Sequence, residues 1–137
     1  MTRPGANPGG TLVLDSEGPA KAVLRDREVT TWLALARADD LRVVTSAATP
    51  VEVMHPRIDR AAREWTLSRL VVEPVADAVA RRAAALLAEN GLHGHEYALD
   101  AVAAATALAA PGPVSVLTSD REDLVVLCGG RAAVIAI

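Results

Sequence analysis

The stretch TLVLD, residues Thr11–Asp15, is a short apolar run that ends in a carboxylate. Val favours strands, and a run this apolar is typical of a strand with helices on both faces. We therefore expect a buried first strand with Asp15 at its carboxyl end. Further strands of the same character are predicted at Leu41–Ser46, Arg69–Val75, Val114–Thr118 and Ala132–Ile137.

Helical patterns separate these strands. Gly18-Pro19 opens a helical stretch, because Pro is tolerated at the first helical position, and the stretch continues through Arg27–Asp39. The later helices are predicted at Thr49–Glu52, Ile58–Leu67, Ala76–Glu89, His95–Ala110 and Ser119–Leu127. Strands that alternate with helices form parallel β-α-β units with right-handed crossovers. The sequence therefore predicts an α/β fold, an open three-layer α/β/α sandwich around a parallel five-stranded sheet.

Length and composition indicate one domain. The chain has 137 residues, just over half of them apolar, which suits a single globular domain. Residues 1–10 contain three Gly and two Pro, so we expect a flexible tail at 1–10 and a single domain over 11–137.

Cysteine content, hydropathy and charge argue against several classes of protein, including membrane-spanning and secreted proteins. Cys128 is the only cysteine, so an internal disulfide is excluded and a cytoplasmic location is expected. No apolar run approaches the roughly 20 residues of a membrane span, and the first ten residues do not resemble a secretory signal. The net charge of −3 argues against a purely electrostatic nucleic-acid binder.

Four of the 17 acidic residues stand in apolar surroundings: Asp15, Glu52, Asp100 and Asp120. Asp15 and Asp120 each follow a predicted strand, so in a parallel sheet they fall at the same edge, where such folds bind ligands. Asp100 lies on an Ala-rich helix that is able to approach its neighbours closely. Together they predict an acidic cluster at the carboxyl edge of the sheet.

Each of these acids also has a purely structural interpretation. Glu52 completes a T-x-x-E capping box, and Asp15 suits the cap of the turn that follows it. Asp120 falls within an S-x-x-E pattern, where the helix dipole favours an acid. Asp100 is compatible with a solvent-facing position. A shared crevice is the interpretation that accounts for all four at once.

A cluster of carboxylates needs a compensating charge. Two carboxylates about 5 Å apart repel each other by roughly 3 kcal/mol at an effective dielectric near 20. Mg²⁺ relieves this repulsion, because it prefers oxygen ligands and binds through a few carboxylates. His93 and His95 are only two positions apart and do not match zinc spacing, so we interpret them as loop residues.

The segments LVLDS, TPVEVM, YALDAVAAATAL and VLTSDREDL resemble the PIN-domain family, and in particular the VapC-like toxin ribonucleases of bacterial toxin–antitoxin pairs. The likeness extends from Thr11 to Ile137. It implies a PIN-like sandwich in which the first and fourth strands are neighbours. It also implies an endoribonuclease that depends on Mg²⁺ or Mn²⁺ to hydrolyse RNA phosphodiester bonds.

The resemblance also assigns roles to single residues. The catalytic metal ligands that it implies, bound directly or through water, are Asp15, Glu52, Asp100 and Asp120. The residues that the resemblance places next to these acids, where they would support them, are Ser16, Thr118 and Asp123. Candidate contacts to RNA phosphates, spaced by three as along one helix face, are Arg57, Arg60 and Arg63. For Asp123 and the arginines, an ordinary solvated surface is the alternative interpretation.

One position departs from the family pattern. Where many members have a small residue two places after the first Asp, this chain has Glu17, within the turn-like Ser16–Pro19. Glu17 either adds a ligand or faces water. The family also implies a cognate antitoxin, a segment of which enters the active-site groove, and a homodimer.

Other functions compete with a toxin. A PIN nuclease that processes RNA outside any toxin–antitoxin pair is one alternative, and a degenerate PIN domain that only binds RNA or a partner is another. A receiver domain is excluded, because it needs a Lys after the fifth strand and the only Lys is Lys21. A D-x-D phosphatase is disfavoured, because Ser16-Glu17 follows Asp15.

Overall fold

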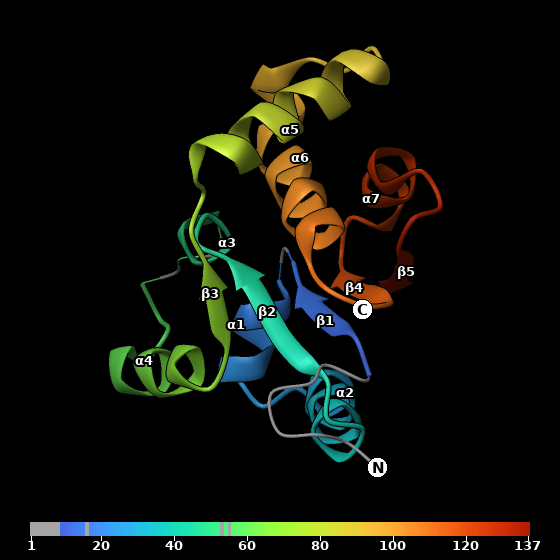
Figure 1. Ribbon diagram of the computed structural model, residues 1–137. Coiled ribbons are helices and arrows are strands. Elements are labelled where there is room, and N and C mark those ends of the chain that lie inside the picture. Colours follow the sequence, from blue (N-terminus) through green and yellow to red (C-terminus); the bar gives the residue numbers. More distant parts are fainter. Residues whose placement is uncertain (1–8, 16, 53, 55) are drawn as a thin grey trace.

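Five parallel strands form the centre of the computed structural model, which describes residues 9–15, 17–52, 54 and 56–137 (Figure 1). The strands are β1 (Thr11–Leu14), β2 (Arg42–Ser46), β3 (Val71–Glu73), β4 (Val114–Thr118) and β5 (Ala133–Ala136). They are ordered β3-β2-β1-β4-β5, and every neighbouring pair is parallel. The predicted parallel five-stranded sheet is confirmed, as is the adjacency of the first and fourth strands.

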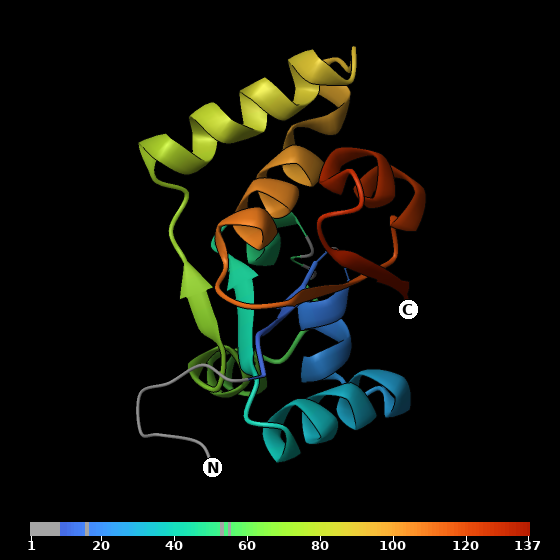
Figure 2. The same cartoon turned by 45° about the vertical axis from the view of Figure 1, so that its right-hand side comes forward.

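Helices cover both faces of the sheet (Figure 2). They are α1 (Gly18–Val23), α2 (Arg27–Ala38), α3 (Thr49–Glu52), α4 (Arg60–Ser68), α5 (Asp77–Glu89), α6 (Gly94–Ala109) and α7 (Arg121–Cys128). Val13 and Val116 of the sheet pack with α5, α6 and α7 in one core cluster. Leu12 and Leu117 pack with α2 in a second cluster on the other face. The predicted three-layer sandwich is confirmed.

Alternation along β1 produces the two clusters. Successive side chains of a strand point to opposite faces, so Leu12 and Leu14 join one cluster and Val13 joins the other. All four residues of β1 are buried. This double burial explains why the run TLVL has no polar side chain other than Thr11, whose hydroxyl donates to the Pro111 carbonyl at 2.9 Å.

The structure differs from the predicted elements in two places. The helical stretch after Gly18 is two helices, because Arg25 has a positive φ of 56° and Asp26 caps α2 by accepting from the Val29 amide at 3.1 Å. The third strand is shorter than predicted, because the Leu70 amide still bonds to the Leu67 carbonyl at the end of α4.

The amino end of the described chain is tied to the sheet. Residues 1–8 of the predicted tail lie outside the described residues. Gly10 is buried, and its carbonyl accepts from the Arg42 amide at 3.1 Å. Its φ is +88°, and a Cβ added there would collide with the Pro113 carbonyl. Within the described part of the chain, no helix combines the length and apolar character needed to cross a bilayer.

We predict that Gly10→Ala destabilises the protein more than Gly91→Ala. Both glycines have positive φ, which opposes an L side chain by about 1–2 kcal/mol, but only Gly10 also places the new methyl group against a backbone carbonyl. Urea denaturation of the two variants measures the difference. Equal losses of unfolding free energy would show that the Pro113 contact is not tight.

Candidate metal centre

Asp15 is the most deeply buried acid at the carboxyl edge of the sheet. Its residue is 1% exposed, and it directly follows β1. The Asp15 amide donates to the Leu117 carbonyl at 2.9 Å, which extends the β1–β4 ladder by one bond. The backbone of Asp15 is therefore held by the two central strands, and its carboxylate is fixed where those strands end.

Thr118 links Asp15 to Asp120. The Thr118 hydroxyl donates to Asp15 Oδ2 at 3.0 Å and accepts from the Asp120 amide at 2.9 Å. One fully buried hydroxyl on β4 therefore orients a carboxylate on β1 and the backbone of a second acid. The family resemblance implied a supporting role for Thr118 beside the acids, and that role stays a prediction.

Asp120 occupies the cap position of α7, yet its side chain makes no capping hydrogen bond. The alternative interpretation made Asp120 a first-turn residue favoured by the helix dipole, whereas the residue stands one position earlier, at the cap. On the opposite side of the site, Asp100 is half-buried on α6. The residues that follow it, Ala101 and Ala103 to Ala107, are all buried, so α6 lies close against the sheet.

Three carboxylates meet at this edge. One oxygen each from Asp15, Asp100 and Asp120 lie within 4.8 Å of one another. They come from the ends of β1 and β4 and from α6, three segments far apart in the sequence. A donor set made only of carboxylate oxygens is the kind that hard divalent cations such as Mg²⁺ prefer, so the cluster has the chemistry to bind a metal ion.

The cluster is electrostatically strained without a cation. Burial, followed by the negative charges of Asp120 and Asp15, raises the pKa of Asp100 from 3.8 to about 8. Asp123 on α7 adds its own charge and a hydrogen bond that act in the same direction. At neutral pH the metal-free site therefore keeps a proton on Asp100, which reduces the repulsion among the acids.

Tyr97 lies beside the cluster and was not among the predicted site residues. It stands one turn before Asp100 on α6, and the charge of Glu96, then burial and the charge of Asp123, raise the pKa of its hydroxyl. The i, i+3 spacing to Asp100 is the sequence signal that would have found it.

The other residues singled out in the sequence either lie outside the described part of the structure or stand apart from the three carboxylates. Glu52 ends α3, and its side chain lies outside the described part of the structure, as does Ser16. Glu17 is exposed in the turn before α1 and is not part of the three-carboxylate group. His93 and His95 are exposed; His93 precedes α6, but His95 lies within the helix and not in a loop.

The three arginines do not share one helix face. Asp59 caps α4 by accepting from the Ala62 amide at 2.9 Å, so the helix starts at Arg60 and Arg57 lies in the turn before it. The prediction of a common face is therefore wrong for Arg57. Arg63 is half-buried, and its guanidinium donates to the Met54 sulfur at 3.3 Å and to Glu64 at 3.1 Å.

Comparison with known proteins supports the fold. No protein-family model and no curated protein matches the sequence. Among solved structures, the crystal structure of VapBC2 from Rickettsia felis bound to a DNA fragment from their promoter matches with a TM-score of 0.67. The match has 13% sequence identity and covers 93% of this chain and 98% of that chain. The fold is VapC-like. The resemblance predicted from the sequence is thus confirmed at the level of the fold.

We predict that the metal-free protein loses stability as the pH rises from about 4 to about 8. Over this range the folded chain holds a proton on Asp100 that the unfolded chain has released, because the pKa is raised on folding. The contribution of the Asp100 proton to the free energy of unfolding is therefore fully present below about pH 4. It is lost once the pH has risen to about 8. Asp100→Asn should raise the melting temperature at pH 8.5 and change it little at pH 5.

Thermal denaturation in a chelator at both pH values measures this effect. Asp77→Asn is the matched control, because Asp77 is exposed on α5, away from the cluster, and pairs with Arg81 at 2.7 Å. The same response of both variants at pH 8.5 would mean that the proton does not reside on Asp100.

Proposed function

We propose that this chain is a metal-dependent endoribonuclease that hydrolyses RNA phosphodiester bonds, and that it is the toxin of a toxin–antitoxin pair. The observation that carries the proposal is the meeting of Asp15, Asp100 and Asp120 within 4.8 Å at the carboxyl edge of a VapC-like fold. The resemblance in the sequence supplies the step from a metal site to RNA cleavage.

The residues present fit a divalent cation. Three carboxylates whose oxygens lie within 4.8 Å of one another, with a raised pKa at Asp100, form a site where a cation would reduce the mutual repulsion. Asp15, Asp100 and Asp120 would hold Mg²⁺ or Mn²⁺, and Glu52 would add a fourth ligand, directly or through water. A bound ion of this kind lowers the pKa of a water molecule and offsets charge on phosphate oxygens.

The chain's own residues then position the reaction. Thr118 keeps the Asp15 carboxylate and the Asp120 backbone in register by its two hydrogen bonds. A hydrogen bond between Asp123 and the protonated Asp100 joins the two side chains in the metal-free site, and Ser16 is proposed to support the acids by a hydrogen bond. Asp100 must release its proton before all three carboxylates can act together as anionic ligands.

Substrate contacts are proposed outside the cluster. Arg60 is exposed at the start of α4, and Arg57 is exposed just before it. Arginine pairs with phosphate in a two-pronged geometry, so both are proposed to bind RNA phosphates. Arg63, although engaged with Met54 and Glu64, is proposed to contribute charge to the same end of the helix.

The proposed partners follow from the same likeness. The similar solved structure is a VapBC2 complex on promoter DNA. We extend the partner to this chain as a proposal: an antitoxin segment enters the groove at the acids, and the toxin is a homodimer in the cytoplasm. A processing nuclease without an antitoxin is the runner-up. A neighbouring gene whose product suppresses RNA cleavage would favour the toxin over the processing nuclease.

We predict that Mn²⁺ or Mg²⁺ raises the melting temperature of the wild type. Ligand at 100 times its dissociation constant stabilises a folded protein by about 2.7 kcal/mol. Asp15→Asn and Asp100→Asn should remove most of the shift, whereas Asp77→Asn should keep it. A shift of the same size in all four proteins would place the metal elsewhere.

We also predict that purified protein cleaves single-stranded RNA only with Mg²⁺ or Mn²⁺, and that Asp15→Asn or Asp120→Asn lowers the rate by about 100-fold or more. Gel analysis of labelled RNA, with circular dichroism to verify folding, measures this. Metal binding without cleavage in the wild type would instead identify a degenerate domain that only binds RNA or a partner.

A further inference from the structure

A second large depression lies at the other edge of the sheet. It is a cleft of about 580 Å³ between α2 and α4, with residues from the amino ends of β2 and β3 in its floor. The three carboxylates lie beyond the carboxyl ends of the strands. The cleft is therefore separated from them by the length of the sheet, and Asp15, Asp100 and Asp120 do not line it.

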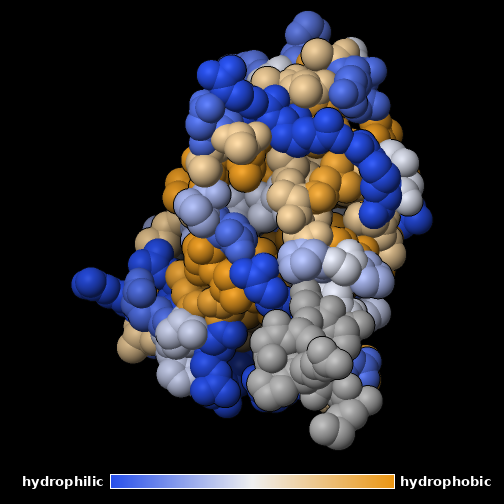
Figure 3. All heavy atoms as spheres, in the orientation of Figure 1, coloured by the Kyte–Doolittle hydropathy of each residue, from blue (hydrophilic) through white to orange (hydrophobic). Residues whose placement is uncertain are grey.

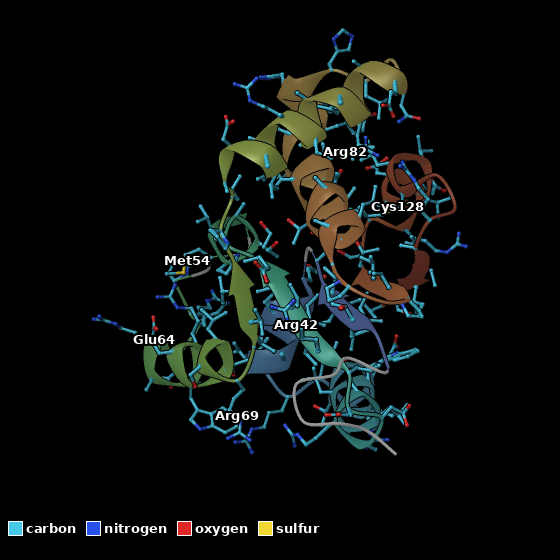
Figure 4. All side chains as sticks on the ribbon, in the orientation of Figure 1. Arg42, Met54, Glu64, Arg69, Arg82 and Cys128 are labelled. Atoms are coloured by element: carbon cyan, nitrogen blue, oxygen red, sulfur yellow. The ribbon has the colours of Figure 1, made fainter. Side chains whose placement is uncertain are left out.

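The walls of the cleft combine apolar and cationic side chains. Its apolar floor includes Leu33, Leu41, Val43 and Leu70. Among the described residues, the charged side chains that line it are Arg25, Arg37, Arg42, Arg69 and Asp40. Figure 3 shows apolar atoms bordered by hydrophilic ones over β2 and β3, and Figure 4 shows Arg69 at the lower end of α4 and Arg42 in front of β2.

Three of the four arginines that line the cleft form no ion pair with a described residue. Arg42 pairs with Glu73 at 3.0 Å. Arg25, Arg37 and Arg69 form no ion pair with any acidic side chain in the described part of the chain. In a protein with a net charge of −3, a concentration of unpaired arginines around one cleft favours an anionic occupant.

Trp65 adds a stacking surface at the same rim. It is 57% exposed, and the guanidinium of Arg69 lies 5.1 Å from its ring centre. Proteins that bind single-stranded nucleic acid combine a cationic groove with aromatic side chains on which bases stack. An exposed Trp beside unpaired arginines, above an apolar floor that can take bases, has this combination.

We propose that the α2–α4 cleft binds a single-stranded segment of the RNA whose scissile bond lies at the three carboxylates. This inference rests on the proposed ribonuclease function and adds a second, distant contact to it. The phosphates would lie on Arg25, Arg37 and Arg69, and a base would stack on Trp65. Binding there sets affinity and minimum substrate length without touching the reacting atoms.

The helix α1 connects the two places. Its first residue, Gly18, packs against Leu14 near the carboxyl edge, and Ala22 near its other end lines the cleft. Strands of four or five residues span about 15 Å at roughly 3.3 Å per residue. An RNA strand that contacts both places must extend over at least this distance along α1.

The experiment uses the full chain carrying Asp15→Asn, so that RNA is bound without being cut. Fluorescence anisotropy compares an oligonucleotide of 5 nucleotides with one of 15, over a range of salt concentrations. We expect the longer RNA to bind at least tenfold more tightly. Adding Arg37→Gln and Arg69→Gln should abolish that advantage and leave the short RNA unaffected.

The salt dependence gives an independent readout. Each lost phosphate contact on a single strand lowers the slope of log affinity against log salt by about 0.7, so the double change should lower it by about 1.4. The matched control is Arg81→Gln with Arg131→Gln, which removes the same charge outside the cleft and should change neither slope nor length dependence.

Two outcomes would overturn the inference. Equal loss of long-RNA binding in the control pair would show a general charge effect. Tighter binding of an acidic peptide than of RNA, abolished by Arg37→Gln and Arg69→Gln, would make the cleft a protein-docking site. Binding is measured without catalysis, so failure of the ribonuclease proposal would appear separately, as wild-type protein that binds RNA and does not cleave it.

Discussion

Repulsion among Asp15, Asp100 and Asp120 is the constraint around which the rest of the domain is organised. Three carboxylates with oxygens within 4.8 Å of one another oppose folding unless a proton or a cation reduces their charge. The raised pKa of Asp100 is the protein's response when no cation is present. The surrounding elements must hold the acids together against this repulsion, and each of them contributes in a recognisable way.

The sheet contributes the fixed half of the site. β1 and β4 are adjacent and in register along their whole length, from Thr11 opposite Val114 to Leu14 opposite Leu117. The bond from the Asp15 amide to Leu117 continues this ladder, and the Thr118 hydroxyl joins the two acids beyond it. The backbone of Asp15 is therefore held by the β1–β4 ladder, and Thr118 links the Asp15 carboxylate to the Asp120 amide.

Much of this arrangement was predictable from the sequence, and the reasons for the exceptions are local. The strand before Asp15 and the strand before Asp120 are short, apolar runs, so their shared edge follows from parallel topology alone. The approach of Asp100 follows from the alanines after it. The break at Arg25 was missed because it depends on a positive φ and on an Asp26 cap, which a helical pattern of apolar residues does not reveal.

The positions of the arginines could not be predicted from the sequence. Regular spacing suggested one helix face for Arg57, Arg60 and Arg63, but a cap at Asp59 starts the helix after the first of them. The arginines of the α2–α4 cleft come from several separate elements, so no spacing rule along the chain brings them together. Tertiary contacts decide both features, and they are absent from any local pattern.

The alanines of α6 have a mechanical consequence. Alanine has no side-chain rotamers, so the buried positions Ala103, Ala104 and Ala107 of α6 cannot repack to absorb a displacement of the helix. If Asp100 moves away from Asp15 and Asp120, α6 must move as a rigid rod, and its partner α5 must follow because the two helices pack together over much of their length. The spacing of the three carboxylates is therefore tied to the position of the α5–α6 helix pair on the sheet.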